Sequence, residues 1–149
     1  MSFELTTKQL DLKARARDLA SGIVANNAAE VDKSEQYPWD NVKALKEAGF
    51  MGMTVPEELG GPGLNFLDAN LVVEEMASYC GPTGRIAVEA NMGAISAVVH
   101  YGTETQKRLA ADLVLDGDKP AICITEPEAG SAASQMTTRA DKRGDKYII

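Results

Sequence analysis

Apolar residues recur at helical spacing along most of the chain. One stripe of an amphipathic helix is formed by five residues at i, i+4, i+7, i+8 and i+11: Leu12, Ala16, Leu19, Ala20 and Ile23. Just before this stripe, Thr6 and Gln9 have the spacing of a capping box, in which each side chain bonds to a backbone amide that the helix leaves unpaired. The pattern therefore predicts a helix that begins at Thr6.

Proline and glycine mark the ends of the next predicted elements. Pro38 is favoured at the first position of a helix, and Gly49 can adopt the left-handed conformation that ends one, so a helix is expected over residues 38–48. Pro56 and several glycines make a helix or central strand impossible over residues 50–64. This segment is therefore expected to be an ordered loop.

Two more helices follow that loop in the prediction. Asn65 can cap the first of them. Residues 81–84 break the chain, and the next helix is expected over residues 85–100, weakened locally by Gly93. The apolar stripe of the first helix is Leu67, Leu71, Val72, Met76 and Tyr79.

After one further helix, the sequence pattern changes from helical to strand-like. Thr103 and Gln106 form a second capping box, and Gly117 closes the helix that it opens. Beyond this point the pattern predicts strands, two of them joined as a hairpin by a turn at residues 142–145. The expected strands are residues 121–124, 137–140 and 146–149.

The order of these elements indicates the fold class and the domains. The fold is expected to be mainly α, with a helical domain over residues 1–118 and the beginning of an incomplete β-domain over residues 119–149. So few strands cannot form a stable sheet without partners. We therefore interpret the chain as the front part of a larger protein.

Composition and charge narrow the range of partners. The chain carries 15 Lys and Arg against 22 Asp and Glu, which gives a net charge of −7. This balance argues against binding to nucleic acid or to an anionic membrane surface. No apolar run approaches the roughly 18 residues of a membrane span, and residues 1–4 lack the features of a signal peptide. A cytoplasmic protein is expected.

Isolated polar residues give few signs of catalysis. His100 closes an apolar helix, where a capping or packing role fits better than general base catalysis. Glu74 and Glu75 are adjacent in a helix and point about 100° apart, so they cannot act as a paired acid and base. One of the two is expected to be structural and the other solvated. Cys80 and Cys123 match no metal-ligand spacing and are interpreted as buried thiols.

The segment Thr125-Glu126-Pro127-Glu128-Ala129-Gly130-Ser131 directly follows the first predicted strand. A turn at a strand end can present backbone amides and hydroxyls to the polar edge of a flat heterocycle or to a thioester carbonyl. The same composition is also typical of an ordinary surface loop. From the pattern alone, both interpretations stay open.

Four motifs in the same order and spacing resemble the acyl-CoA dehydrogenase family. The resemblance covers essentially the whole chain, which looks like the N-terminal helical domain of that family followed by the opening of its middle β-domain. The motifs are residues 49–63 (GFMGMTVPEELGGPG), Glu74-Glu75, residues 102–107 (GTETQK) and residues 125–131 (TEPEAGS).

Membership would imply an FAD-dependent enzyme in which an acyl-CoA thioester lies against the flavin. Carried over by position, Ile122, Ile124 and Thr125 would line the flavin. Gly130 and Ser131 would reach the flavin or the CoA arm, which also makes Ser131 a substrate-binding residue.

Two positions depart from the usual pattern of the family. An aromatic residue is common where Ile122 stands, and Asp is common in place of Ala132, so flavin stacking and loop contacts are in question there. The carboxylate base of the family would lie beyond Ile149. No catalytic residue is therefore assigned within this chain.

Arg85 narrows the class of substrate. Its guanidinium is always charged and offers a planar fork of donors suited to a carboxylate or a sulfinate. From the residues alone, an exposed Arg at a helix start fits equally well. An Arg at this place resembles the residue that meets the distal acid in glutaryl-CoA dehydrogenases and the sulfinate in 3-sulfinopropionyl-CoA desulfinases.

The surrounding sequence looks more similar to the desulfinase group, for example in residues 35–41 and 110–124. The expected function is therefore that of an FAD enzyme acting on a short acyl-CoA with an acidic tail, by desulfination. An α,β-dehydrogenase of short-chain or glutaryl-type acyl-CoA is the alternative. A non-catalytic helical binding or assembly module is a further alternative. The resemblance also implies a homotetramer.

Overall fold

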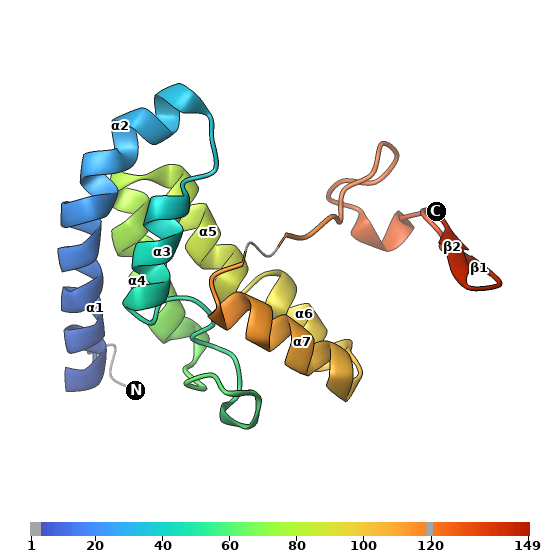
Figure 1. The fold of residues 1–149 in the computed structure, drawn as a ribbon, viewed down its shortest axis with the longest axis horizontal. Helices are drawn as coiled ribbons and strands as arrows, with labels where there is room; N and C mark the ends of the chain where they lie inside the picture. Colours follow the sequence, from blue (N-terminus) through green and yellow to red (C-terminus); the bar gives the residue numbers. More distant parts are fainter. Residues whose placement is uncertain (1–3, 119–120) are drawn as a thin grey trace.

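A computed structural model of the chain describes residues 4–118 and 121–149. Figure 1 shows its helices gathered in one bundle, while residues 121–149 extend away from that bundle toward the C-terminus. The expectation of a mainly α fold with a small β element at the end is confirmed. The helices are α1 (Thr7–Leu19), α2 (Ala25–Ser34), α3 (Trp39–Glu47), α4 (Phe66–Tyr79), α5 (Gly81–Asn91), α6 (Ala94–Tyr101) and α7 (Glu104–Leu115).

The first helix begins as its capping box predicts but runs further. The Gln9 amide donates to the Thr6 hydroxyl at 3.3 Å, and the Thr6 amide donates to the Gln9 side chain at 3.0 Å. A π-helical turn at Ala20–Val24 then connects α1 to α2, with Gly22 at φ −89° and ψ −106°. Glycine tolerates this non-helical conformation, so the chain continues past the predicted stripe and bends instead of ending.

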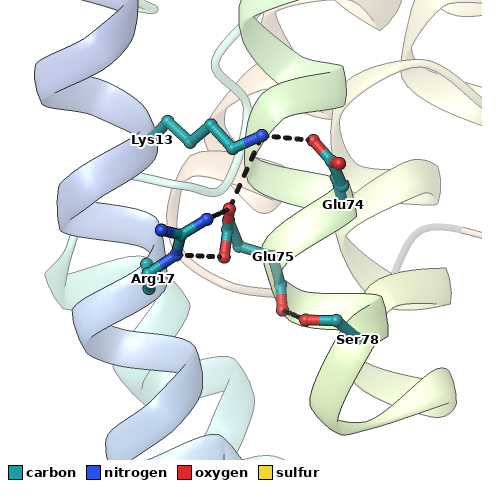
Figure 2. A network of polar contacts seen from close by, with 5 residues as sticks. All are labelled: Lys13, Arg17, Glu74, Glu75 and Ser78. Carbon is teal, nitrogen blue, oxygen red and sulfur yellow. Dashed lines mark hydrogen bonds and ion pairs between the residues drawn. The ribbon is translucent and has the colours of Figure 1, made fainter.

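A group of charged side chains joins α1 to α4 (Figure 2). Arg17 donates from Nε and from a terminal nitrogen to the two carboxylate oxygens of Glu75, at 3.1 and 2.9 Å. Lys13 lies 2.7 Å from Glu74 and 3.7 Å from Glu75. The hydrogen bond from Arg17 lowers the pKa of Glu75 from its ordinary value. Glu75 is buried and Glu74 is exposed, which confirms that one is structural and the other solvated.

The buried face of α4 is turned slightly from the predicted stripe. Leu71, Val72 and Met76 are buried as expected, but Leu67 is 52% exposed and Tyr79 is 44% exposed. Asp68 and Glu75 take positions on the buried face instead, because each has a polar partner there: Gln9 for Asp68 and Arg17 for Glu75. In α7, Leu109 and Leu113 are likewise exposed, while Ala111 and Val114 are buried.

The expected break at residues 81–84 is wrong, because these residues form the first turn of α5. Pro82 is compatible with a first turn, where no helical amide partner is needed. The expected single helix over residues 85–100 is also wrong. It is divided at Gly93, whose φ of −87° and ψ of −115° are not helical, so that α6 is a separate helix.

Buried amides fix the start of α5. Asn27 on α2 donates to the side-chain oxygen of Asn41 on α3 at 2.7 Å, and Asn41 donates to the hydroxyl of Thr83 at 2.8 Å. Thr83 in turn donates to the sulfur of Cys80 at 3.1 Å. These bonds connect α2, α3 and the first turn of α5, where Arg85 begins the second turn.

Asn91 fixes the other end of α5 to the loop before α4. Its side chain donates to the carbonyl of Phe50 at 2.9 Å and accepts from the amide of Met53 at 2.6 Å. Phe50, Met53 and Val55 from this loop are buried in the core. The loop is therefore ordered, as expected, because its apolar side chains and its backbone are both held by the bundle.

The β part is smaller than predicted. Strands β1 (Asp141–Arg143) and β2 (Lys146–Ile148) form an antiparallel hairpin in which Arg143 pairs with Lys146. The turn is therefore Gly144-Asp145, and the first arm lies later than the predicted residues 137–140. Residues 121–124 form no strand, and Cys123 is exposed although a buried thiol was expected there. Residues 121–124 are all exposed.

The second expected domain begins at residue 119, and residues 119–120 lie outside the described residues. Cys80 is buried as predicted. No helix within residues 4–118 and 121–149 is long and apolar enough to span a membrane.

Candidate functional site

Arg85 lies on the solvent side of a helix that is otherwise largely buried. Its neighbours Gly84, Ile86 and Ala87 are buried, whereas the Arg85 side chain is 67% exposed. A terminal nitrogen of its guanidinium pairs with Glu89 one turn further along α5. A guanidinium has five N–H donors in a planar fork, so this one contact leaves donors that can bind an anion.

A surface depression of about 410 Å³ opens beside Arg85. The connection between α2 and α3 forms one wall, and the start of α5 forms the other. Burial raises the pKa of Tyr37 in this wall, and the Asp118 carboxylate raises it further. The residues that line the depression are Val31, Glu35, Gln36, Tyr37, Pro38, Pro82, Arg85 and Ile86.

Glu89, the partner of Arg85, is itself buried. Its side chain is 11% exposed, and its Oε2 atom has no hydrogen-bond partner among the described residues. The carboxylate fits here because Gly93 has no side chain. A Cβ atom at Gly93 would lie 2.1 Å from Glu89 Oε2.

The residues expected to line the flavin lie in the extended segment after the bundle. Ile122 and Ile124 are 44% and 48% exposed, and Thr125, Gly130 and Ser131 are exposed as well. Figure 1 shows this segment running away from the helix that holds Arg85. The structure therefore places the candidate site residues in two separate regions and does not bring them together.

The 125–131 segment is nevertheless held in a defined shape. Glu126 and Ala129 exchange two backbone hydrogen bonds of 3.1 Å each, which closes a tight turn at Pro127-Glu128. The Glu126 carboxylate accepts hydrogen bonds from the Thr137 amide at 2.6 Å and the Thr138 amide at 2.9 Å, and from both hydroxyls. These bonds, above all that of the Thr138 hydroxyl, lower the pKa of Glu126 to about 2. Two of the amides expected to face a ligand are thus used within the turn.

Other residues considered from the sequence have structural partners. Nδ1 of His100 lies 2.8 Å from the carbonyl of Ser96 in the same helix, which fits a capping role and not a catalytic one. Within the part of the chain that the structure describes, no group of His, Cys, Asp and Glu could hold a metal ion.

Sequence reasoning missed Glu89 and the amides that position α5. Asn41 and Asn91 are polar residues at helical positions that are buried. A polar residue at a core position indicates an internal hydrogen-bond network, because buried polar groups need partners. Glu89 follows Arg85 by four residues, which is the spacing of a helical ion pair. That spacing could have singled out Glu89.

Comparison with known proteins relates the chain to the acyl-CoA dehydrogenase family. Residues 6–118 match the model of the acyl-CoA dehydrogenase N-terminal domain. A 3-sulfinopropanoyl-CoA desulfinase of Variovorax paradoxus is 64% identical over 99% of this chain, and one of Advenella mimigardefordensis is 59% identical over the same share. The chain spans 37% of the length of each of these relatives.

Solved structures agree with this assignment. Butyryl-CoA dehydrogenase from Megasphaera elsdenii superimposes with a TM-score of 0.83 at 30% identity, over 97% of this chain and 39% of that one. The bundle α1–α7 corresponds to the residues that the family model matches. The chain therefore belongs to the acyl-CoA dehydrogenase family.

Proposed function

We propose that this chain is the N-terminal part of an FAD-dependent enzyme that releases sulfite from 3-sulfinopropionyl-CoA. Two relatives that share 64% and 59% of its residues are described as 3-sulfinopropanoyl-CoA desulfinases, which supports this substrate. Residues 1–118 would form the helical domain, and residues 119–149 would begin the middle β-domain. The chemistry itself would need residues outside this chain.

The observation that carries the proposal is the exposed guanidinium of Arg85 on a rigid helix. Thr83 and Asn91 anchor α5 on either side of it, so the position of its backbone is fixed. The guanidinium borders a depression whose wall is partly apolar, with Val31, Pro82 and Ile86 among the lining residues. Such a surface suits an acyl chain that ends in an anion, because the chain packs on apolar atoms while the sulfinate meets the fork of donors.

The residues present after the bundle fit a flavin. Ile122 and Ile124 are exposed apolar side chains two positions apart, which an extended chain places on one side. Ser131 is exposed, so a ligand could reach its hydroxyl. Ile122, Ile124 and Thr125 would contact the flavin ring, while Gly130 and Ser131 would reach the flavin or the CoA arm. When bound, FAD supplies the redox-active ring against which acyl thioesters lie in this family.

The test uses the full-length flavoenzyme that carries this chain. Sulfite release from 3-sulfinopropionyl-CoA and oxidation of butyryl-CoA are measured for the wild type, Arg85→Ala and Arg85→Lys. Arg85→Ala should cost about 2–5 kcal/mol in kcat/KM on the acidic substrate and almost nothing on butyryl-CoA, because it leaves the anion without its partner. Arg85→Lys should restore only part of the loss, since an ammonium cannot reproduce the fork.

Arg108→Ala serves as the control, because Arg108 is an exposed arginine on α7 that donates to the carbonyl of Glu58. It should leave both activities unchanged. Equal losses on acidic and neutral substrates in Arg85→Ala would overturn the role of Arg85. Oxidation of glutaryl-CoA without any sulfite release from 3-sulfinopropionyl-CoA would favour the dehydrogenase alternative.

The homotetramer and the cytoplasmic location stay predictions. Sedimentation of the full-length enzyme tests the first, and cell fractionation tests the second.

A further inference from the structure

Glu89 is placed in a way that stability alone does not explain. A carboxylate loses hydration on burial, and an acceptor atom left without a partner adds to that cost. Glu89 is 11% exposed at its side chain, and its Oε2 has no partner among the described residues. Its one ion pair within the described residues is with Arg85, in the order Arg then Glu along the helix, which is the less favourable order for an ion pair at i and i+4.

Burial and the fixed helix α5 restrict where the Glu89 carboxylate can lie. The carboxylate lies against Gly93, where no Cβ atom would fit, and α5 is fixed beyond it by Asn91. Arg85, by contrast, has a long side chain that is 67% exposed and would otherwise sample many rotamers. The buried Glu89 carboxylate thus holds one nitrogen of the exposed Arg85 guanidinium.

We propose that Glu89 is a positioning residue for the acidic end of the substrate, acting through Arg85. By holding one terminal nitrogen of Arg85, Glu89 orients the planar guanidinium. The remaining N–H donors of Arg85 then face the depression beside α5. A guanidinium that is already oriented loses less side-chain entropy when it binds a sulfinate or carboxylate than a guanidinium that is free to rotate. This inference rests on the proposed function of Arg85.

Simple electrostatics predicts the opposite effect, which makes the inference testable. A carboxylate near the binding site repels an anionic substrate, so its neutralisation should tighten binding if Glu89 acts only by charge. If Glu89 positions Arg85, neutralisation should weaken binding of acidic substrates and leave neutral ones unchanged. The direction of the change therefore separates the two roles.

The experiment compares Glu89→Gln with the wild-type full-length enzyme. Glutamine keeps the shape of the side chain and removes its charge. The KM for 3-sulfinopropionyl-CoA and the Kd of succinyl-CoA, measured by calorimetry, should both rise about tenfold. The kcat for sulfite release, the flavin content and the Kd of butyryl-CoA should not change. Glu89→Asp, which keeps the charge but withdraws it from Arg85, should weaken acidic ligands as well.

Two further variants provide controls. Glu104→Gln removes an exposed carboxylate that pairs with Lys107 on α7, at 2.9 Å, and should change nothing. In an Arg85→Ala background, Glu89→Gln should have no additional effect on KM, because its partner is gone.

Three results would overturn the inference. They are tighter binding of succinyl-CoA by Glu89→Gln, equal changes on acidic and neutral ligands, and an undiminished effect of Glu89→Gln without Arg85. If Arg85→Ala itself fails to separate acidic from neutral substrates, the proposed function fails together with this inference. If Arg85→Ala does separate them and Glu89→Gln does not weaken acidic ligands, only the positioning role fails.

Discussion

Gly84 on α5 packs directly against Ala77 on α4. A Cβ atom at Gly84 would lie 2.5 Å from the Cβ of Ala77 and 2.7 Å from its Cα, closer than such atoms approach in proteins. The two helices pack extensively along their length, so the glycine sets how near they come. Arg85 is the next residue, and its position depends on this approach.

Gly84→Ala should therefore destabilise the bundle by about 1–3 kcal/mol, because backbone atoms and not a flexible side chain oppose the added methyl group. Urea denaturation measures the change. Gly81→Ala in the same helix is the matched control, since nothing apart from its chain neighbours and the backbone of its own helix lies within 4 Å of its Cβ position. That variant should be neutral or slightly stabilising. Equal destabilisation by both substitutions would contradict this account of the α4–α5 contact.

Arg17→Ala should lower the Tm by about 2–4 °C, since it removes two hydrogen bonds from the buried carboxylate of Glu75. Lys43→Ala, which breaks an exposed pair with Glu47 at 4.0 Å, should have little effect. The hydrogen bond from Arg17 lowers the pKa of Glu75, so its contribution is complete above the ordinary value of 4.5 and is lost as the pH falls through the lowered pKa. The difference in Tm between wild type and Arg17→Ala should accordingly shrink below pH 4.5. If the difference in Tm stayed constant down to the pH of acid unfolding, the Arg17–Glu75 pair would not be its cause.

The carboxyl of Glu126 should titrate at about pH 2, far below its ordinary value of 4.5. Since the folded pKa is the lower one, the turn it holds should be stable above pH 4.5 and should loosen only as the pH falls toward 2. Carbon NMR of the side-chain carboxyl checks this. Thr138→Val removes the hydrogen bond with the largest effect and should raise the pKa of Glu126. An unchanged pKa in Thr138→Val would show that the Thr138 hydroxyl does not hold the carboxylate.

Cys123 should react with a thiol reagent in the native chain, whereas Cys80 should react only after denaturation, because Cys123 is exposed and Cys80 is buried. Mass spectrometry after alkylation identifies the modified residue, and Cys123→Ser should abolish native labelling. In the full-length enzyme, a complete β-domain should protect Cys123 as well. Labelling of Cys123 at the same rate in both proteins would contradict the proposal that residues 119–149 begin that domain.

Local sequence determined where α1, α3, α4 and α7 begin. The capping boxes at Thr6 and Thr103 are present as predicted, because the side chains and amides that form them lie within four residues of each other. Gly49 adopts the left-handed conformation expected of a helix end, with φ of 75°. Position 85 could also be selected from the sequence, since its guanidinium suits an anion and stands in a helix of largely apolar residues.

The tertiary structure decided which face of each helix is buried and where α5 begins. Leu67 was expected in the core, but Asp68 is buried in its place because Gln9, 59 positions earlier in the chain, reaches its carboxylate. Residues 81–84 look like a break, yet they are helical because Asn41 holds Thr83 and because Gly84 fits against Ala77. Contacts between residues so far apart in the chain do not appear in the spacing of apolar and polar residues.

The same reason explains what was missed at the candidate site. The spacing of Arg85 and Glu89 permits an ion pair, but the burial of Glu89 depends on the break at Gly93 and on the space that this glycine leaves. A sequence pattern fixes which residues can meet along one helix. Packing against the other elements decides which of these residues are buried. At this site it buries the carboxylate of Glu89, so that an ion pair of a kind common on surfaces has one dehydrated partner.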